Sequence, residues 1–249
     1  MESALRSSFF GLASIALAGG AVLAQCGNVW LPSKGYAGVA GDVDAICVWD
    51  LDGSGPAPAL VVFGGTFAVA GTLQCANIVA YDPASGTWLP LGSGVAGSVR
   101  ALAVLPNGDL VAGGSFVSAG GVAAERIARF DGTVWSPLGS GLTSSGPFVA
   151  GVDALVVLPN GDLVAGGTFR VAGSVAADYV ARWNGSAWSA LAQGLDGPVR
   201  ALAAGANGEV VAGGEFLAAV GGPVAHRIAS FGAAGWSPLG IGMDDGVDA

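Results

Sequence analysis

The chain is poor in charged side chains and in the residues that most often bind metals or nucleic acids. Charged residues make up 11% of its 249 residues, and it contains one lysine, one histidine and three cysteines. The formal net charge is −9. Because nucleic-acid binding depends on cationic contacts to phosphate, this balance argues against a nucleic-acid partner, and it disfavours anionic membrane surfaces for the same reason. The negative charge is better explained as a means of keeping an apolar chain soluble.

The scarcity of histidine and glutamate excludes the clearest catalytic patterns. His226 has no neighbouring carboxylate, so we interpret it as a surface loop residue, and no spacing of Cys and His suggests zinc. The Gly-x-Ser-x-Gly sequence of a hydrolase nucleophile is missing. With four glutamates in the whole chain, a glycosidase would have to use aspartates, none of which shows a distinctive spacing. The composition therefore favours a protein that is not an enzyme.

One long apolar run, residues 9–24, follows Arg6 near the N-terminus. Small residues before Gln25 are typical of a cleavage site, so residues 1–24 are predicted to be a secretory signal peptide. An N-terminal membrane anchor is the alternative, although the run is shorter than a bilayer span requires. A lipoprotein site at Cys26 is weaker still. Proline and glycine interrupt every later apolar stretch, so we expect a secreted, extracellular or cell-envelope protein with no membrane insertion after signal cleavage.

The three cysteines, Cys26, Cys47 and Cys75, all lie in the N-terminal third of the chain. An odd number permits at most one intramolecular disulfide. In a secreted protein a bridge is plausible, between Cys47 and Cys75 or between Cys26 and Cys75. Three buried or free thiols are an equally good expectation.

What the chain has in abundance is glycine, 44 residues, much of it placed by an internal repeat. Four Gly-Gly pairs recur at steps of 49, 53 and 47 residues and end at Gly65, Gly114, Gly167 and Gly214. Four tryptophans recur at steps of 47, 53 and 48 residues, namely Trp88, Trp135, Trp188 and Trp236. Because two independent markers change their spacing together, the period is real. The repeats are predicted near 43–98, 99–151, 152–198 and 199–246.

Each repeat holds four short apolar segments, which in the second repeat are roughly 99–105, 109–116, 125–131 and 133–139. Pro-Asn-Gly, Ala-Gly-Gly and Asp-Gly sequences separate them, and Asn-Gly or Asp-Gly between apolar runs is a strong hairpin signal. No helical period of appreciable length occurs within a repeat. The pattern predicts an all-β chain, a β-propeller of four-stranded antiparallel blades over 43–249.

One large aromatic side chain per repeat, at a fixed place, is what a wedge between neighbouring blades would need. We therefore expect the recurring tryptophans to pack between blades, and an exposed row that stacks carbohydrate is the alternative. Trp183 stands where the other copies have Tyr81, Phe130 and Phe231, which again indicates packing.

The pattern resembles kelch-like propeller repeats, in which a Gly-Gly pair ends the second strand and an aromatic residue and a tryptophan follow. The first repeat has Gly64-Gly65, Tyr81 and Trp88 in that order, whereas later copies shorten the last gap. More closely, Gly-Gly-x-Phe, Ile-Ala-Arg-aromatic and Trp-Ser-Pro-Leu-Gly look like repeats of secreted bacterial propeller proteins of unknown function and of the Rax2-type cell-polarity marker. The resemblance covers residues 43–240 and implies the propeller fold. The copper chemistry of some kelch-like propellers needs histidine ligands that this chain lacks.

Both ends of the chain carry partial repeats. Within the N-terminal segment 25–42, residues 28–33 look like a closing strand with no blade before it, and residues 246–249 look like the truncated opening of a fifth repeat. Three expectations stay open: a truncated product of a larger propeller, a four-bladed ring, and an association of partial rings. An open ring would leave apolar faces and unpaired strand edges exposed.

The second residue of each opening strand alternates in charge, as Asp44, Arg100, Asp153, Arg200 and, in the last partial repeat, Asp248. First strands of propeller blades line the central channel, so these side chains are predicted to lie around one channel mouth. They either pair across blades and hold the blades in register, or form a polar mouth that binds a small polar ligand.

Asp50, Asp52 and Ser54 replace the tight turn of the other copies and resemble a short calcium loop, which places oxygen ligands at alternate positions. Because no downstream glutamate completes a cage, a plain extended hairpin loop is the alternative, and no other cofactor is suggested. Asn184 begins a glycosylation sequon, although its Asn-Gly pair is better explained as a hairpin turn.

These features predict a secreted or surface-exposed, non-enzymatic scaffold that binds a protein or glycan partner. We expect its functional surface at the loops that differ between copies, of which 49–59 and 142–150 are the longest. The alternatives are a fragment of a larger propeller without independent function, and a hydrolase or lyase with its site at the channel mouth.

Overall fold

The computed structural model describes residues 38–53, 55–144, 149–205, 207–245 and 247. These residues belong to one compact unit, Lys34–Ala249. The predicted signal peptide, Cys26 and the closing-type segment 28–33 lie outside the described residues, as does Asp248. The described part of the chain consists of β-strands and turns, with no helix.

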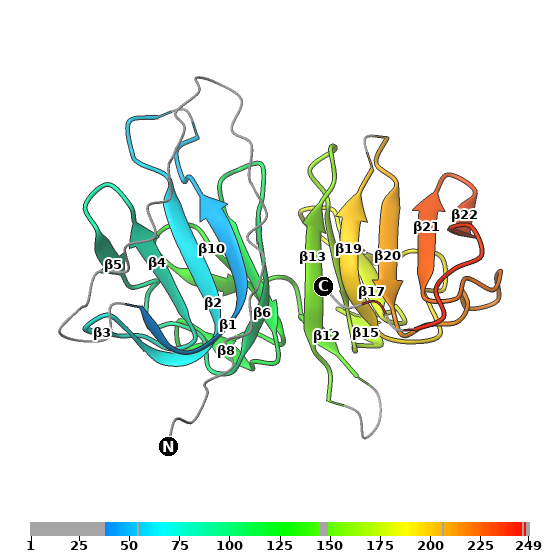
Figure 1. Cartoon of the computed structure of the whole chain (residues 1–249), viewed down its shortest axis with the longest axis horizontal. Coiled ribbons are helices and arrows are strands. Elements are labelled where there is room, and N and C mark those ends of the chain that lie inside the picture. Colours follow the sequence, from blue (N-terminus) through cyan, green and yellow to red (C-terminus); the bar gives the residue numbers. More distant parts are fainter. Residues whose placement is uncertain (1–37, 54, 145–148, 206, 246, 248–249) are drawn as a thin grey trace, which may run out of the picture. The chain divides into compact units, whose positions relative to one another are not determined.

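The strands form four antiparallel sheets, one for each predicted repeat, which we call blades 1 to 4 (Figure 1). Blade 1 comprises β1 (Val39–Trp49), β2 (Leu60–Ala70), β4 (Ile78–Asp82) and β5 (Thr87–Leu89). Blade 2 comprises β6 (Val99–Val104), β7 (Leu110–Gly114), β10 (Ile127–Phe130) and β11 (Trp135–Pro137). Blade 3 comprises β13 (Val152–Val157), β14 (Leu163–Gly167), β17 (Val180–Trp183) and β18 (Trp188–Ala190). Blade 4 comprises β19 (Val199–Ala204), β20 (Val210–Gly214), β21 (Ile228–Gly232) and β22 (Gly235–Pro238).

Six two-residue strands lie in the connections. In blade 1, β3 (Leu73–Gln74) pairs with β2, and β8 (Ser118–Ala119) and β9 (Val122–Ala123) form a small hairpin in blade 2. β12 (Leu142–Thr143) pairs with β15 (Val171–Ala172), which also pairs with β16 (Val175–Ala176). The fold is an all-β propeller of four-stranded antiparallel blades, and the architecture read from the repeat is confirmed.

The Gly-Gly pair of each blade is explained by two close approaches, as blade 2 shows. A Cβ built on Gly114 would overlap the carbonyl oxygen of Ser98 in the facing strand, whereas one built on Gly113 would lie 2.5 Å from Cγ1 of Val152 in blade 3. Since real Cβ atoms do not approach this closely, both positions require glycine. One glycine therefore serves the pairing within a blade, and the other serves the packing of the next blade.

A β-bulge faces each Gly-Gly pair. The register of β6 against β7 skips from Val99 to Ala101, which leaves Arg100 without a ladder partner. The corresponding strands of the other blades skip one residue in the same way, and the skipped residues are Asp44, Asp153 and Arg200. A bulge re-aims the side chain of its extra residue. Every described member of the alternating Asp/Arg set therefore sits on a bulge at the start of a first strand.

Apolar cores lie between consecutive blades, and the first strands β1, β6, β13 and β19 contact one another in that order. Three of the recurring tryptophans are buried at these interfaces. Each of their indole N–H groups donates to a leucine carbonyl of the preceding blade: Trp135 to Leu91 at 2.8 Å, Trp188 to Leu138 at 3.0 Å, and Trp236 to Leu191 at 3.0 Å. For these three residues the interpretation as wedges between blades is confirmed.

Candidate functional site

The bulged charged residues of blades 2, 3 and 4 form one ion-pair network. Asp153 accepts from Arg100 Nη1 at 2.9 Å through one carboxylate oxygen and from Arg200 Nη1 at 2.6 Å through the other. Arg200 also donates to Glu215 from Nε at 3.0 Å and from Nη2 at 2.6 Å. The side chain of Asp153 is only 9% exposed. The network therefore links three consecutive blades through one nearly buried carboxylate.

Arg200 stays cationic in this network. Its partial burial alone would lower its pKa, but the hydrogen bond to Glu215 and the charges of Asp153 and Glu215 raise the pKa overall. Because the two arginines and two carboxylates offset one another, the network can hold blades in register without any ligand.

Asp44 does not extend this network into blade 1. It is exposed, and in the described part of the chain it has no ion pair or hydrogen bond. The expected pairing across blades is therefore present for Arg100, Asp153 and Arg200, and Asp44 does not take part in it. The nearly buried carboxylate of Asp153 lies between Arg100 and Arg200 and accepts from both. Binding of a small polar ligand at this mouth stays a prediction.

The segment proposed as a calcium loop closes on itself through Asp52. Oδ2 of Asp52 accepts the N–H of Ala57 at 3.0 Å, and its carbonyl accepts the N–H of Gly55 at 3.2 Å. Oδ1 of Asp50 is buried without a hydrogen-bond partner, and Ser54 lies outside the described residues. Among the described residues no three His, Cys, Asp or Glu side chains are grouped to hold a metal ion. The contacts of Asp52 fit the plain hairpin loop, and calcium binding stays a prediction.

Of the alternatives for the cysteines, the Cys47–Cys75 disulfide is wrong, and the alternative of free thiols is what the structure has at both residues. Cys47 faces Val62 on β2, whereas the N–H of Cys75 bonds to Ala68, six residues further along the same strand. At the rise of a β-strand this separation is about 20 Å, far beyond the reach of a disulfide. Burial raises the pKa of Cys47 to about 12, so its thiol stays protonated and unreactive.

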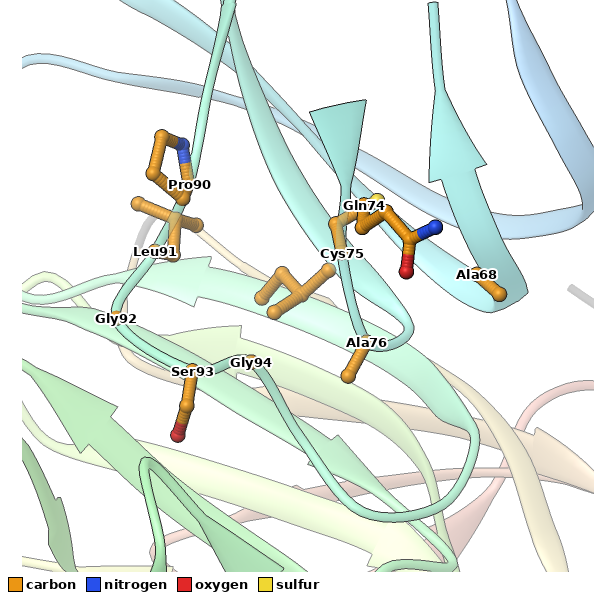
Figure 2. Close-up of a pocket in the computed structure, with 10 residues that line it drawn as sticks. Ala68, Gln74, Cys75, Ala76, Pro90, Leu91, Gly92, Ser93 and Gly94 are labelled. Carbon is orange, nitrogen blue, oxygen red and sulfur yellow. The ribbon is translucent and has the colours of Figure 1, made fainter. Parts of the chain in front are cut away.

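Cys75 lines a pocket of about 300 Å³ in blade 1. Figure 2 shows the segment 74–76 on one wall of this pocket and the segment 90–94 on the other. Burial raises the pKa of Cys75 as well. The remaining lining is mostly apolar side chains and glycine, so this pocket offers no cluster of polar groups that would orient a ligand.

His226 lies on the surface in the loop that precedes β21, as the sequence indicated. It is exposed, its N–H donates to the carbonyl of Leu217 at 3.1 Å, and its φ is 43°. The following Arg227 also has a positive φ, of 71°. His226 and Arg227, with their positive φ angles, therefore shape the turn of the chain before β21.

The long loop 49–59 packs onto blade 2. The indole N–H of Trp49 donates to the carbonyl of Gly108 at 2.8 Å, and Trp49 packs edge-on against Phe130 with ring centroids 5.7 Å apart. Together with Leu51 these rings line an apolar pocket of about 520 Å³ between blades 1 and 2. Of the other long loop, residues 145–148 lie outside the described residues.

A second groove, between blades 2 and 3, was missed by sequence reasoning. It has a volume of about 400 Å³, and its polar and aromatic lining comes from Asn107, Arg129, Asn160, Asp162, Trp183 and Asn184. The signal was present in the sequence as an indole where other repeats have a phenol or a phenyl ring. The repeat pattern indicates only packing at that position, because a linear pattern does not show which part of a ring faces a groove.

One comparison with known protein families agrees with the fold. The family model of the Rax2 C-terminal beta propeller domain matches residues 54–133, which span most of blades 1 and 2. A search of curated proteins finds no match. Among solved structures, the extracellular domain of the hybrid two component system BT4673 from B. thetaiotaomicron is 10% identical with a TM-score of 0.24. That alignment covers 82% of this chain and 30% of the other chain, so this chain spans less than a third of its length.

The described residues hold no helix with the length and apolar character of a membrane span. The matched segment supports the resemblance to Rax2-type repeats and the propeller class, and it assigns no ligand.

Proposed function

We propose that this chain is a secreted or surface-exposed, non-enzymatic β-propeller scaffold that binds a protein or glycan partner. The observation that supports it best is a difference between repeated and non-repeated residues. The Gly-Gly pairs, which recur in every blade, and the buried tryptophans of blades 2, 3 and 4 pack the blades together. In the grooves between adjacent blades some lining residues differ between copies, namely Trp49 and Leu51 between blades 1 and 2, and Trp183 and Asn184 between blades 2 and 3. A constant frame with variable grooves is the arrangement expected of a binding scaffold.

The channel mouth supports the same proposal. A general acid or base must exchange a proton with its substrate. At the mouth, both carboxylate oxygens of Asp153 already accept hydrogen bonds from arginines, and Arg200 is held by two carboxylates. These contacts favour a role in blade packing over a role in hydrolysis or elimination.

The proposal is tested with the full chain on immobilised polysaccharides and on cell-envelope proteins, with the heat-unfolded chain as the control. We expect saturable retention on at least one of these surfaces by the folded chain and none by the unfolded chain. The bound material is recovered and analysed by chromatography for cleavage products. Release of shortened products would contradict the non-enzymatic proposal and favour a hydrolase or lyase. Absence of saturable retention on every surface would contradict the binding proposal.

A further inference from the structure

The groove between blades 2 and 3 has the size and the polar lining of a small-ligand site. Its volume of about 400 Å³ lies within the usual range for such sites. It runs between the Pro-Asn-Gly turns of the two blades, where Gly161 lies close to Pro106. One aromatic side chain, Trp183, and five polar ones line it.

Two exposed asparagines in the groove orient their amide groups through hydrogen bonds to their own turns. Oδ1 of Asn184 accepts the N–H groups of Ser186 at 3.0 Å and Ala187 at 2.9 Å. Oδ1 of Asn107 accepts the N–H of Asp109 at 3.2 Å. Because each oxygen is occupied, the amide N–H₂ groups are left as donors, and among the described residues they have no partner. A donor that is already oriented loses little entropy when a ligand binds.

The indole of Trp183 adds a third donor and an apolar edge. This half-buried ring packs against Trp188 with ring centroids 5.3 Å apart. Its N–H has no hydrogen-bond partner in the described part of the chain, unlike the N–H of Trp188, which bonds to Leu138. The ring gives an apolar surface for C–H groups of a ligand, and its free N–H can donate to a hydroxyl group beside them.

The charges that border the groove are already paired. Arg129 donates to Asp109 at 3.0 Å, and Arg182 pairs with Asp162, which also accepts from Asn160 at 2.8 Å. Both aspartates are nearly buried. A ligand in this groove therefore meets neutral donors and internally balanced ion pairs, which favours a neutral polar molecule over an anion.

The grooves on either side lack this combination. Between blades 1 and 2 the pocket is apolar, with Trp49, Leu51 and Phe130 among its lining residues. Between blades 3 and 4 the groove has Asn160, Arg182 and Asn207 but no aromatic ring. The pairing of an indole with oriented amide donors thus occurs in the described chain between blades 2 and 3.

We propose that this groove binds a short stretch of a neutral glycan, with the Trp183 indole and the amide groups of Asn107 and Asn184 as the contacts. The inference rests on the proposed binding function and specifies its partner and its location. Sugar hydroxyl groups accept from the three free donors, and the C–H groups of a pyranose ring pack against the indole.

The repeat itself supplies variants that should fold. Trp183→Phe introduces the residue that blades 2 and 4 use at this position, Phe130 and Phe231, and it removes the N–H. Asn184→Asp introduces the residue that blade 2 uses there, because Asp131 makes the same turn with Oδ1 accepting from Thr133 and Val134 at 2.8 Å each. It replaces a neutral donor with a charged acceptor. Tyr81→Phe, at the repeat position equivalent to Trp183 but in blade 1, is the matched control.

Binding is measured by isothermal titration with cellohexaose, maltohexaose, xylohexaose and chitohexaose, and with hexagalacturonate as an anionic probe. We expect at least one neutral oligosaccharide to bind, and we expect both groove variants to weaken it about tenfold, the effect of one lost hydrogen bond of about 1.4 kcal/mol. Tyr81→Phe should leave the affinity unchanged. Thermal melts of all three variants verify that each is folded.

Three results would overturn the inference. If a neutral oligosaccharide binds the groove variants as tightly as the unchanged chain, its site lies elsewhere. The proposed binding function would then still stand. Tighter binding of hexagalacturonate would show that the ligand is an anion. No binding of any probe would exclude a glycan of these types, and retention on envelope proteins would then decide whether the binding proposal itself survives.

Discussion

The interface between blades 2 and 3 and the outer face of blade 4 are built from equivalent residues with opposite exposure. Leu138 and Leu142 of blade 2 are 1% and 0% exposed, whereas their counterparts in blade 4, Leu239 and Met243, are 39% and 49% exposed. The sequence spacing from the preceding tryptophan is the same in both blades. An apolar position in a repeat therefore shows which side of a blade is made for packing, and burial depends on whether another blade covers it.

Blade 1 shows the same contrast on its opposite face. Val99 of blade 2 is fully buried against Gly64 of blade 1, whereas the equivalent Val43 is exposed. At the position where blades 2, 3 and 4 have a buried alanine, blade 1 has Phe63, whose ring packs against Trp88 at 5.5 Å. The larger ring covers part of a face that in the other blades is covered by a neighbour.

The largest difference between an inner and an outer position is expected for leucine truncation. Leu138→Ala should lower the free energy of unfolding by about 2–5 kcal/mol, because it removes a fully buried side chain and leaves a cavity. Leu239→Ala, its matched control, should cost less than about 1 kcal/mol, since its side chain is already in contact with solvent. Urea unfolding of both variants measures the comparison. Equal losses would mean that the face of blade 4 is covered in solution.

The second comparison adds a methyl group at two equivalent glycines. A Cβ on Gly166 would lie 2.5 Å from Cγ1 of Val199 inside blade 4, and one on Gly213 would lie 2.7 Å from Cγ1 of Val247. Gly166→Ala should cost about 1–3 kcal/mol, because the neighbouring strand cannot move away.

Gly213→Ala should cost clearly less than Gly166→Ala, since Val247 lies outside the four blades and can shift. Thermal and urea unfolding measure the loss of unfolding free energy in both variants. A Gly213→Ala loss as large as that of Gly166→Ala would show that Val247 is held as firmly as a strand of a complete blade.

The third comparison isolates the hydrogen bond of a closing tryptophan. Trp188→Phe removes the N–H that satisfies the carbonyl of Leu138, which should cost about 1–3 kcal/mol in addition to the lost ring volume. Trp88→Phe loses similar volume, but in the described part of the chain its indole N–H has no acceptor. Because Trp188 is buried and Trp88 is half-buried, the difference between the two losses of unfolding free energy is an upper limit for the hydrogen bond. A difference near zero would mean that the bond contributes little beyond packing.

The smallest effect is expected for the ion-pair network. Asp153→Ala should cost roughly 1 kcal/mol at low salt, because its arginine partners are partly exposed and solvent screens them. Asp44→Ala, the unpaired equivalent in blade 1, should be close to neutral. Unfolding at low salt and at about 1 M salt tests the electrostatic origin, since screening should reduce the first effect. A loss that does not change with salt would indicate packing instead.

The strand pattern, the Gly-Gly pairs and the packing role of three tryptophans could be predicted from the sequence because the repeat states each of them four times. The pairing of Arg100, Asp153 and Arg200 also followed from their equivalent positions. The repeat did not show that Asp44, at the equivalent position of blade 1, would stay outside this pairing, and the cysteines lie outside the repeated pattern. The Cys47–Cys75 bridge was inferred from number and compartment, while the register places the two thiols far apart along one strand.

The groove between blades 2 and 3 was missed for a related reason. Arg129 and Trp183 belong to different blades and lie 54 positions apart in the sequence, so no local pattern joins them. They line one groove because consecutive blades pack with the turn of one beside the turn of the next.

The sequence by itself determined the class of fold and the number of complete blades, because period, turn chemistry and alternating burial act locally and recur. Only the tertiary structure decided which equivalent residues are buried, which charges meet and where a polar groove opens. Those outcomes depend on contacts between blades, and each blade sees a different neighbour. Four similar repeats therefore produce blades whose surfaces are not identical.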